Sequence, residues 1–402
     1  MIFGDWIYVV FLILAATIFR LLPPNARPWW LAACGLAFYA YYSPVFVGLL
    51  AVEVVIVYVL VGHGKDSNWP YVLAGVVCVG ALAVFKYGGM FGGAARQLVG
   101  ILTNRTLPSF PALILPLAIS FFTFEFVHYV IDARKGTLPE HRFADFLAFM
   151  LFFPTMVAGP IKRFQDFQPQ IAAAHADATA VNDGVMRITV GLAKKICLAD
   201  TLTPATALLQ STAAVASARP VDIAIALLAF AAKIYMDFSG YSDIAIGSAR
   251  LFGIHVPENF SWPYARRNIA EFWRHWHMSL TSWITDYVYK PLGGNRRGLP
   301  RTALNVVLAM AVSGLWHGAQ WHFVVWGLFH GALLAGFRGW ESLVKRPLLA
   351  RVPWLAEGRV ARVLGTVGAV LGGAATFALV TVGWGLFAMP VDRFMLMLGR
   401  LL

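Results

Sequence analysis

The sequence predicts an all-α protein that crosses a membrane several times, and three observations lead to this fold class. Of the 402 residues, 59% are hydrophobic and only 13% are charged, against about 25% charged residues in an average soluble domain. Several apolar stretches approach the roughly 20 residues that a helix needs to cross a hydrocarbon core of about 30 Å. The basic residues lie mainly between these stretches, as the positive-inside rule describes. No polar stretch is long enough for a separate soluble domain, so we expect residues 1–402 to form a single integral membrane domain.

The expected helices follow one another along the chain as apolar segments. Allowing for interruptions, we expect ~10–12 membrane-embedded helices. The clearest segments are Trp6–Ile18, Trp29–Tyr42, Val45–Val61, Trp69–Phe85, Phe110–Ile131, Val221–Ala245, Ala303–Phe337 and Val363–Met389. Two further segments are interrupted, Phe143–Ile161 and Met186–Leu198.

Charge and cysteine usage exclude two other kinds of site. The net charge is +12, but the basic residues cluster beside apolar segments, so we expect a membrane lipid environment and no nucleic-acid partner. The three cysteines lie in separate apolar segments without the spacing of metal ligands, so we expect no metal site.

A histidine in an apolar segment is the strongest functional signal. Ala303–Phe337 contains no Asp, Glu, Lys or Arg, yet His317 stands near its middle, in Trp316-His317-Gly318. An ionisable side chain at membrane depth costs several kcal/mol, ~2.5–3.5 kcal/mol when it is charged, and marks a functional site. Both flanks are basic and the segment is short for two full spans, so we expect a broken or re-entrant pair with these three residues at the turn.

A polar stretch in an otherwise apolar region suggests a second part of the site. Lys233 and Asp237 are four residues apart and can meet on one helix face. Asp237-Phe-Ser239-Gly-Tyr241-Ser-Asp243 then gathers carboxylates and hydroxyls around a glycine. Two interpretations remain open: a buried structural ion pair with a helix break, or the lining of a substrate path.

The segment Ile269–Tyr287 has a helical aromatic pattern. Trp273, Trp276 and Trp283 fall on one stripe at ~100° per residue, while Arg274 lies on the other side. This pattern predicts one amphipathic helix in the membrane interface, with tryptophans at headgroup depth. His277 lies at the border of the stripe, either as an ordinary interfacial histidine or as a polar neighbour of His317.

At this point the residues resemble the membrane-bound O-acyltransferase family, in its bacterial polysaccharide branch. Trp316-His317-Gly318 and the block from Glu271 to Leu280 carry the resemblance. Further motifs agree with this branch: Ile119-Ser-Phe-Phe-Thr-Phe124, Gly159-Pro-Ile-Lys-Arg-Phe164, Asp237-Phe-Ser-Gly-Tyr-Ser-Asp243, Pro257-Glu-Asn-Phe260 and Pro291-Leu-Gly-Gly-Asn-Arg296. The last motif is more similar to the alginate O-acetylating members than to the teichoic-acid D-alanyl transfer proteins. The resemblance runs from about residue 113 to 387.

The resemblance implies a ring of tilted helices around a central funnel, in a multi-pass protein of the bacterial inner membrane. His317 matches the catalytic histidine of the family, and His277 matches its second polar site residue. The family uses a cytoplasmic thioester donor, so the co-substrate is expected to be acetyl-coenzyme A or another acyl thioester, with no bound cofactor. The acceptor is expected to be a polysaccharide, reached through an extracytoplasmic acyltransferase of the serine-esterase (SGNH) type.

The chemistry of the residues fits this expectation independently. Acyl transfer from a thioester to an alcohol needs a base near neutral pH, which histidine provides. The basic residues Arg296, Arg297, Lys162 and Arg163 suit the phosphates of coenzyme A or an acidic carrier protein. Candidates for the substrate path are Asp237, Ser239, Tyr241, Asp243, Glu258, Asn259, Arg274 and Trp316.

Two alternative functions remain. Within the family, the acyl group could be D-alanyl, passed from a carrier protein to a cell-envelope polymer. In another class, the intramembrane residues Glu53, Glu125, Lys233 and Asp237 are typical of an ion-coupled transporter. A transporter often shows an internal repeat, and the sequence shows none.

Overall fold

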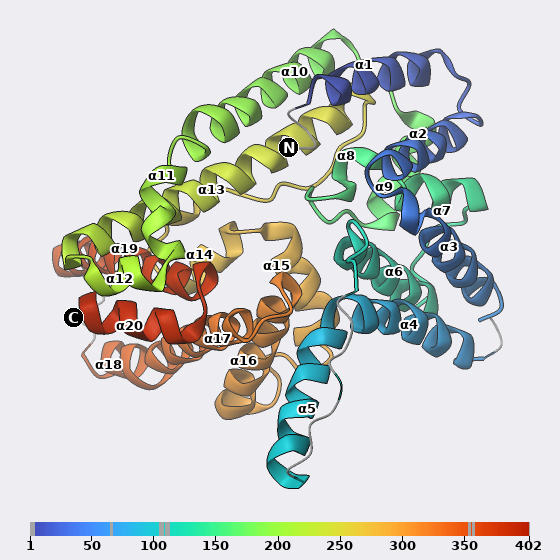
Figure 1. Ribbon diagram of the computed structural model, residues 1–402. Helices are drawn as coiled ribbons and strands as arrows, with labels where there is room; N and C mark the ends of the chain where they lie inside the picture. The colour runs from blue at the N-terminus through green and yellow to red at the C-terminus, as the bar shows by residue number, and fades with distance from the viewer. Residues whose placement is uncertain are drawn as a thin grey trace. The chain divides into compact units, whose positions relative to one another are not determined.

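The computed structural model describes residues 5–64, 67–103, 108, 113–352, 355 and 358–401. Within them the regular elements are all helical (Figure 1). The helices are α1 (Trp6–Leu21), α2 (Arg27–Tyr42), α3 (Val47–Gly62), α4 (Trp69–Leu82), α5 (Gly88–Thr103), α6 (Ile119–Arg134), α7 (Phe143–Met150), α8 (Phe153–Met156), α9 (Phe164–Ala173), α10 (Ala178–Ala193), α11 (Thr203–Thr206), α12 (Thr212–Ser217), α13 (Pro220–Leu251), α14 (Ile269–His275), α15 (Met278–Ile284), α16 (Gly298–His317), α17 (Trp321–Trp340), α18 (Arg346–Arg351), α19 (Gly358–Ala388) and α20 (Val391–Leu401). The all-α prediction is confirmed.

Four helices are long and apolar enough to cross a membrane within the described part of the chain. They are Pro44–Gly62, Trp69–Thr103, Gly298–His317 and Ala361–Ala388, and Trp6–Leu21 is a shorter apolar helix. The other expected segments form shorter or less apolar helices, and the first three residues of Phe110–Ile131 lie outside the described residues. The ring of ten to twelve embedded helices therefore stays a prediction.

The chain divides into two compact units. The first comprises Met1–Lys194 and Ser239–Glu258, and the second comprises Lys195–Phe238 and Asn259–Leu402. Each unit has its own apolar core. The first core is rich in phenylalanine, from Phe146 and Phe149 to Phe164. The second contains the buried tryptophans Trp326 and Trp384. Whether 1–402 acts as one domain stays a prediction.

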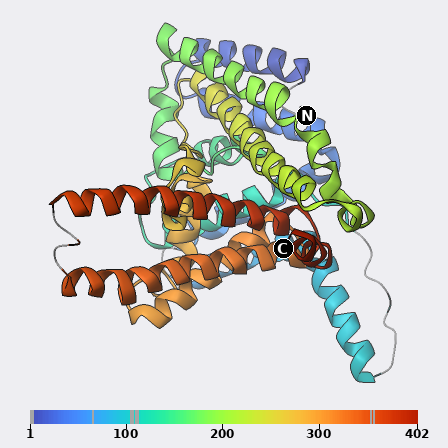
Figure 2. The same cartoon turned by 90° about the vertical axis from the view of Figure 1, so that its left-hand side faces the viewer.

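The second unit is organised by a helical hairpin. Helices α16 and α17 have 20 residues each, which makes each about 30 Å long. They run antiparallel, because Gly327 faces Met310 and Gly331 faces Val307. The long helix α19 packs along α17 (Figure 2). The basic flanks of the hairpin therefore meet at one end, as the sequence predicted. Among the described helices, α16 is long and apolar enough to cross a membrane and α17 is not counted with it, so the broken or re-entrant pair stays a prediction.

Close approach of the two hairpin helices explains why both carry glycine at the contact. A Cβ atom on Gly314 would collide with the carbonyl oxygen of Phe323, and one on Gly327 would collide with that of Met310. Backbone atoms cannot move aside as a flexible side chain can, so a larger residue would force the helices apart. The hairpin turn, and with it His317, depends on these contacts.

Two expected features of the helices are corrected. Helix α13 is continuous from Pro220 to Leu251, so the break expected at Gly240 does not occur. The single amphipathic helix expected over Ile269–Tyr287 is instead two short helices, α14 and α15, separated at Trp276 and His277.

The tryptophans of this segment are buried rather than interfacial. Trp273, Trp276 and Trp283 are only 5%, 2% and 5% exposed. Trp276 packs against Phe260, Phe272 and Trp384, all within the second unit. The aromatic stripe therefore forms part of a protein core.

Candidate active site

His317 is the last residue of α16, at the turn of the hairpin. Gly318 follows it in extended conformation, and α17 begins at Trp321. The imidazole lies in an aromatic surrounding, with its ring centre 5.2 Å from Trp326 and 5.0 Å from Phe387. The sequence placed the turn at residues 316–318, and the structure confirms that position.

His277 occupies the break between α14 and α15. Its backbone is left-handed, with φ of 44°, a conformation uncommon for residues other than glycine and often found at functional sites. The side chain is 1% exposed. Burial lowers the pKa of the His277 imidazole well below its ordinary value, and the nearby His317 lowers it further. Both effects favour the neutral imidazole.

Asn259 holds the His277 ring in place. The Oδ1 atom of Asn259 lies 3.3 Å from Nδ1 of His277 and accepts a hydrogen bond of 2.6 Å from the Ser279 hydroxyl. The backbone amide of Met278 donates to the carbonyl oxygen of Asn259 at 2.9 Å. The side-chain Oδ1 atom of Asn259 can only accept, so its hydrogen bond with His277 requires the proton of the imidazole to be on Nδ1. Its Nε2 atom is buried and has no hydrogen-bond partner among the described residues.

Trp316 connects the two histidines. Its ring centre lies 5.7 Å from that of His277 and 4.7 Å from that of His317. His277 also packs edge-on against Phe238, at 4.6 Å. Four sequence-predicted residues are thus brought together in the second unit: His277, His317, Asn259 and Trp316. Asn259 orients a histidine, a role that the sequence did not indicate.

A cavity of about 390 Å³ lies beside the hairpin in the same unit, within the range of sites for small molecules. Its walls come from α14, α15, α16, α17 and the residues that follow α15; they are Ala270, Trp273, Arg274, Thr281, Ile284, Thr285, Tyr289, Asn295, Val306, Ala309, Met310, Ser313, Leu334 and Arg338. Ser313 lies one helical turn before His317. The cavity therefore runs along α16 toward the end that carries His317, and the predicted residue Arg274 lines it, whereas His317 and His277 are not among its lining residues.

Three of the cavity residues were not singled out from the sequence. Tyr289, Asn295 and Arg338 come from different elements, so no local spacing links them. Arg338 was visible only as one of several basic residues flanking the apolar segment. Arg296 and Arg297, predicted to bind the donor, are exposed in the loop next to Asn295.

The acidic residues of the predicted substrate path form ion pairs. Asp237 pairs with Lys195 at 2.6 Å, rather than with Lys233. In the first unit, Asp243 accepts from Arg187 at 2.9 Å and from Lys194 at 2.6 Å. These contacts favour a structural ion-pair role for the two aspartates of the Asp237–Asp243 motif over the lining of a substrate path.

The remaining path candidates also lie in the first unit. Glu258 is the second partner of Arg187 and is joined to it through both carboxylate oxygens. Ser239 is buried, and Tyr241 packs against the core of that unit.

The prediction that Lys162 binds the donor is wrong. Its ammonium group is buried, pairs with Glu125 at 2.5 Å and lies 4.4 Å from the centre of the Phe149 ring. It is not at a surface where a phosphate could reach it. Arg163 precedes α9 and is half-buried.

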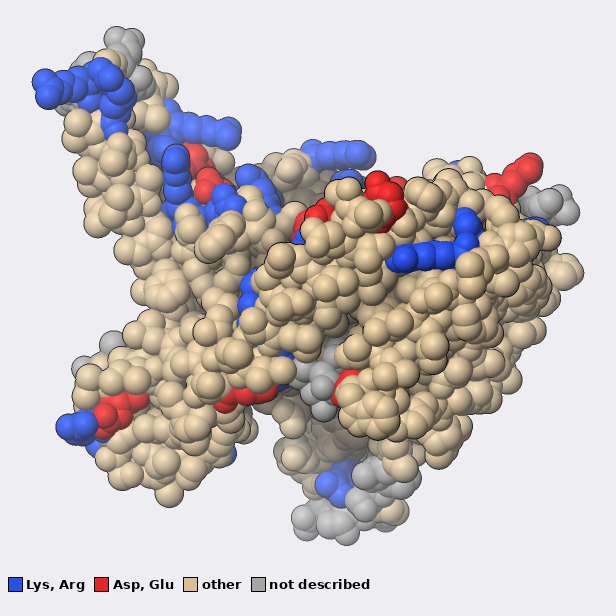
Figure 3. All heavy atoms as spheres, turned by 90° about the horizontal axis from the view of Figure 1, so that it is seen from above, with Lys and Arg blue, Asp and Glu red and all other residues tan. Residues whose placement is uncertain are grey.

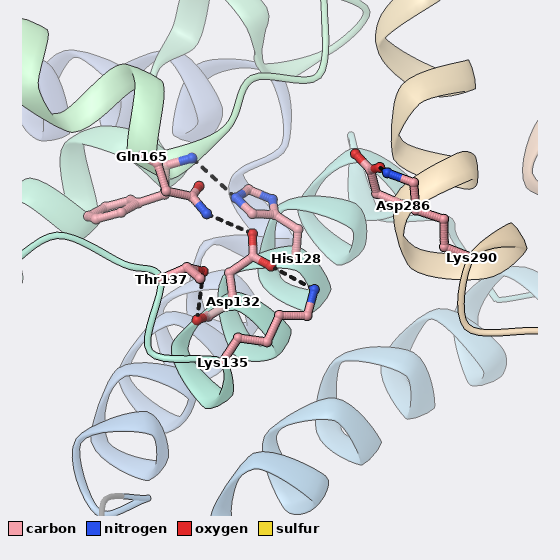
Figure 4. Close-up of polar contacts among 8 residues, drawn as sticks. His128, Asp132, Lys135, Thr137, Gln165, Asp286 and Lys290 are labelled. Atoms are coloured by element: carbon pink, nitrogen blue, oxygen red, sulfur yellow. Dashed lines mark hydrogen bonds and ion pairs between the residues drawn. The ribbon is translucent and has the colours of Figure 1, made fainter. Parts of the chain in front are cut away.

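The motif that contains Lys162 is anchored to α6 by neighbouring bonds. The backbone amide of Phe164 donates to Nε2 of His128 at 3.2 Å. The side-chain amide of Gln165 donates from Nε2 to Oδ2 of Asp132 at 2.8 Å (Figure 4). Lys135 pairs with the other oxygen of Asp132 at 3.3 Å. This motif therefore has a structural role in the first unit.

Comparison with known proteins identifies the family of this chain. Residues 116–364 match the model of the membrane-bound O-acyltransferase family. The probable alginate O-acetylase AlgI of Azotobacter vinelandii is 37% identical over 83% of this chain and 68% of its own length. The peptidoglycan O-acetyltransferase of Helicobacter pylori is 32% identical, over 79% of this chain and 65% of its own length. The teichoic acid D-alanyltransferase of Streptococcus thermophilus is 33% identical, over 54% of this chain and 55% of its own length.

The family match covers the hairpin, the break at His277 and the cavity. The chain spans between about half and about two thirds of the length of these three relatives. The family match covers more than half of the chain, and apolar helices long enough to cross a membrane accompany it. The chain therefore belongs to the membrane-bound O-acyltransferase family and is a multi-pass membrane protein.

Proposed function

We propose that this chain transfers acetyl groups from a cytoplasmic thioester toward hydroxyl groups of an exported polysaccharide, at a centre formed by His317 and His277. The observation that carries the proposal is the state of His277. It is buried, burial lowers the pKa of its imidazole, Asn259 holds the ring, and its Nε2 atom has no hydrogen-bond partner among the described residues. A neutral, oriented imidazole next to a second histidine suits proton transfer.

His317 is the base of the proposed reaction. As the acceptor hydroxyl attacks the thioester carbon, its proton passes to a ring nitrogen of His317. The carbon–sulfur bond then breaks, and the same proton passes from His317 to the departing thiolate. The products are an O-acyl ester and a free thiol, so atoms and charge balance. General acid–base catalysis of this kind contributes ~10²–10⁴ in rate.

His277 orients His317 in this mechanism. Because the His277 proton is on Nδ1, the Nε2 atom can accept the ring N–H of His317 and so fix the tautomer of the base. The same lone pair stabilises the imidazolium that forms on His317. A donor role for His277 toward the thioester oxygen is not favoured, since its only proton is committed to Asn259.

The donor occupies the cavity beside the hairpin. The lining on α16 runs from Val306 to Ser313, about 10 Å along the axis. Arginines contribute to the wall and no carboxylate does. Lys and Arg side chains also gather in separate clusters on the face drawn in Figure 3, with wide uncharged areas between them. By the positive-inside rule, the basic end of the hairpin faces the cytoplasm of a bacterial inner membrane, where acetyl-coenzyme A is available.

The acceptor and the acyl group are proposed from the relatives. Two of the three relatives are named for O-acetyl transfer, and they match the chain over a larger share than the D-alanyltransferase. Acetyl transfer to a polysaccharide therefore leads, through an extracytoplasmic acyltransferase of the serine-esterase type. D-alanyl transfer from a carrier protein is second. Membership of this family favours acyl transfer over ion-coupled transport.

The test is acyl transfer in membranes that contain the full chain. Radiolabelled acetyl-coenzyme A and a carrier protein charged with D-alanine are supplied separately, and label on glycan or on the partner acyltransferase is measured. We expect label from acetyl-coenzyme A, and none with His317→Ala at equal protein level. Label from the carrier alone would replace acetyl by D-alanyl, and label from neither would reject the proposal.

A further inference from the structure

Arg338 is held rigidly at the wall of the cavity by two neutral side chains. Its Nη1 atom donates to the phenol oxygen of Tyr289 at 2.6 Å and to Oδ1 of Asn295 at 2.8 Å. The Tyr289 hydroxyl in turn donates to the same Asn295 oxygen at 2.5 Å. The guanidinium carbon lies 5.4 Å from the centre of the Tyr289 ring. Arg338 is half-buried, and these protein contacts orient its guanidinium group.

The positive charge of Arg338 is not neutralised within the described part of the chain. The salt bridges found there do not include Arg338 or Arg274, the other cation of the cavity wall. The described residues that line the cavity include no Asp or Glu. A fixed guanidinium with free N–H groups and no counter-ion is a site for a phosphate or carboxylate, which arginine can bind through two parallel hydrogen bonds.

The position of Arg338 sets the length of ligand that would fit. Arg338 follows Trp321, the first residue of α17, by seventeen residues, about 25 Å along the helix. Helical side chains lean toward the N-terminus of their helix, so the guanidinium lies several ångströms closer to the turn. A phosphopantetheine arm has about thirteen bonds from phosphorus to sulfur. Its extended length is about 16 Å, taking the advance per bond of an extended peptide. This length is comparable with the distance along α17 from the guanidinium group to the turn.

We propose that Arg338, oriented by Tyr289 and Asn295, binds the phosphate of a 4′-phosphopantetheine thioester, whose arm lies in the cavity with its sulfur directed toward His317. The inference rests on the proposed function and adds the part of the donor that is recognised. The phosphate is common to coenzyme A and to a carrier protein, so one site serves either source. Charge-assisted bonds to the phosphate should account for about a ten- to hundredfold difference in affinity.

The first test measures binding without turnover. The full chain, purified in detergent, is titrated with phosphopantetheine and with pantetheine, and the rise in melting temperature gives each affinity. We expect phosphopantetheine to bind the wild type about ten- to hundredfold more tightly, and Arg338→Gln to remove that difference. Arg351→Gln, an exposed residue of α18 outside the cavity, is the matched control and should retain it. An unchanged phosphate preference in Arg338→Gln would overturn the inference.

A second pair of variants covers the case in which the glutamine variant does not fold. Arg338→Lys keeps the charge but loses the planar fork, and Tyr289→Phe removes one group that orients it. Both should reduce the phosphate preference while binding pantetheine as the wild type does. Equal loss of affinity for both ligands would mean that Arg338 is structural.

The second test separates the two sources of the phosphate. The KM is measured for acetyl-phosphopantetheine, acetyl-coenzyme A and an acetylated carrier protein. Arg338→Gln should raise the KM for all three by about ten- to hundredfold. An increase confined to coenzyme A would assign the contact to its adenosine phosphates, and one confined to the carrier would assign it to the protein surface; either would overturn the inference. If the wild type transfers nothing, the proposed function fails, while the binding test still decides the role of Arg338.

Discussion

Asn259 determines which nitrogen of His277 carries the proton. The Oδ1 atom of Asn259 accepts a hydrogen bond from Ser279 and lies 3.3 Å from Nδ1 of His277. The bond comes from a segment eighteen residues earlier in the chain and reaches the position where α14 and α15 separate. It leaves Nε2 of a buried, neutral imidazole as an acceptor.

The first prediction concerns this bond. Asn259→Leu keeps the volume and removes the acceptor, so we expect turnover to fall by about 10²-fold with much smaller loss of folded protein. Asn259→Asp keeps the acceptor oxygen and should retain more transfer than the leucine variant. A nearby carboxylate favours the protonated imidazole and raises the pKa of His277. The aspartate variant should therefore lose activity at a higher pH than the wild type as the pH is lowered. Coincident acid limbs in the two pH profiles would refute the orienting role.

The second prediction separates packing from chemistry at two adjacent residues. Trp276 is buried among the rings of Phe260, Phe272 and Trp384, so Trp276→Ala should cost about 3–5 kcal/mol and lower the yield of folded protein. His277→Ala should leave the yield nearer to normal and reduce turnover. Size-exclusion profiles and acyl transfer per folded molecule measure the two effects. Equal losses of yield would mean that His277 is structural.

The third prediction concerns the hairpin. Gly327→Ala places a methyl group against the carbonyl oxygen of Met310, whereas a Cβ on Gly336 of the same helix meets nothing within 4 Å. We expect Gly327→Ala to lose about 1–3 kcal/mol, and Gly336→Ala to be neutral or to gain up to about 1 kcal/mol from helix propensity. Melting temperatures in detergent compare the pair. Similar values for both would show that the helices are not in close contact.

The hairpin could be predicted because its signals are local. The uncharged segment, its basic flanks and the glycines on both sides of His317 indicate two helices that return to one side. The ends of the helices were not predicted, since α16 begins at Gly298 and α17 ends at Trp340, beyond the uncharged segment. Helices continue into polar sequence when their backbone bonds allow it, and hydropathy alone does not mark their ends.

The site around His277 and His317 was only partly predictable from the sequence. The aromatic period of Ile269–Tyr287 is unbroken, but tertiary contacts from Asn259 to His277 and Met278 hold a break there. Helical periodicity carries no information about a partner elsewhere in the chain, so a single helix was expected. The site at Arg338 was missed for the same reason, because its three side chains come from three elements.

The fourth prediction tests the topology of the hairpin. Leu299 lies at the start of α16, and Val344 follows the end of α17. Because the two helices run antiparallel, cysteines introduced at these positions should react with a membrane-impermeant reagent from the same side, which we expect to be cytoplasmic. A cysteine at Gln320, in the turn, is the comparison. Labelling of Leu299 and Val344 from opposite faces would contradict a hairpin that returns to its own side.

The last prediction is that His317 carries the proton. His317→Ala should abolish detectable acyl transfer while the protein still inserts, folds and binds phosphopantetheine, because the loss of a general base costs about 10²–10⁴ in rate. His317→Gln keeps polarity and approximate size but cannot accept the proton, so it should be nearly as inactive. The ring packs against Trp326 and Phe387, so folding is checked separately by melting temperature. Transfer at the wild-type rate by a folded glutamine variant would make His317 a packing residue and exclude this mechanism.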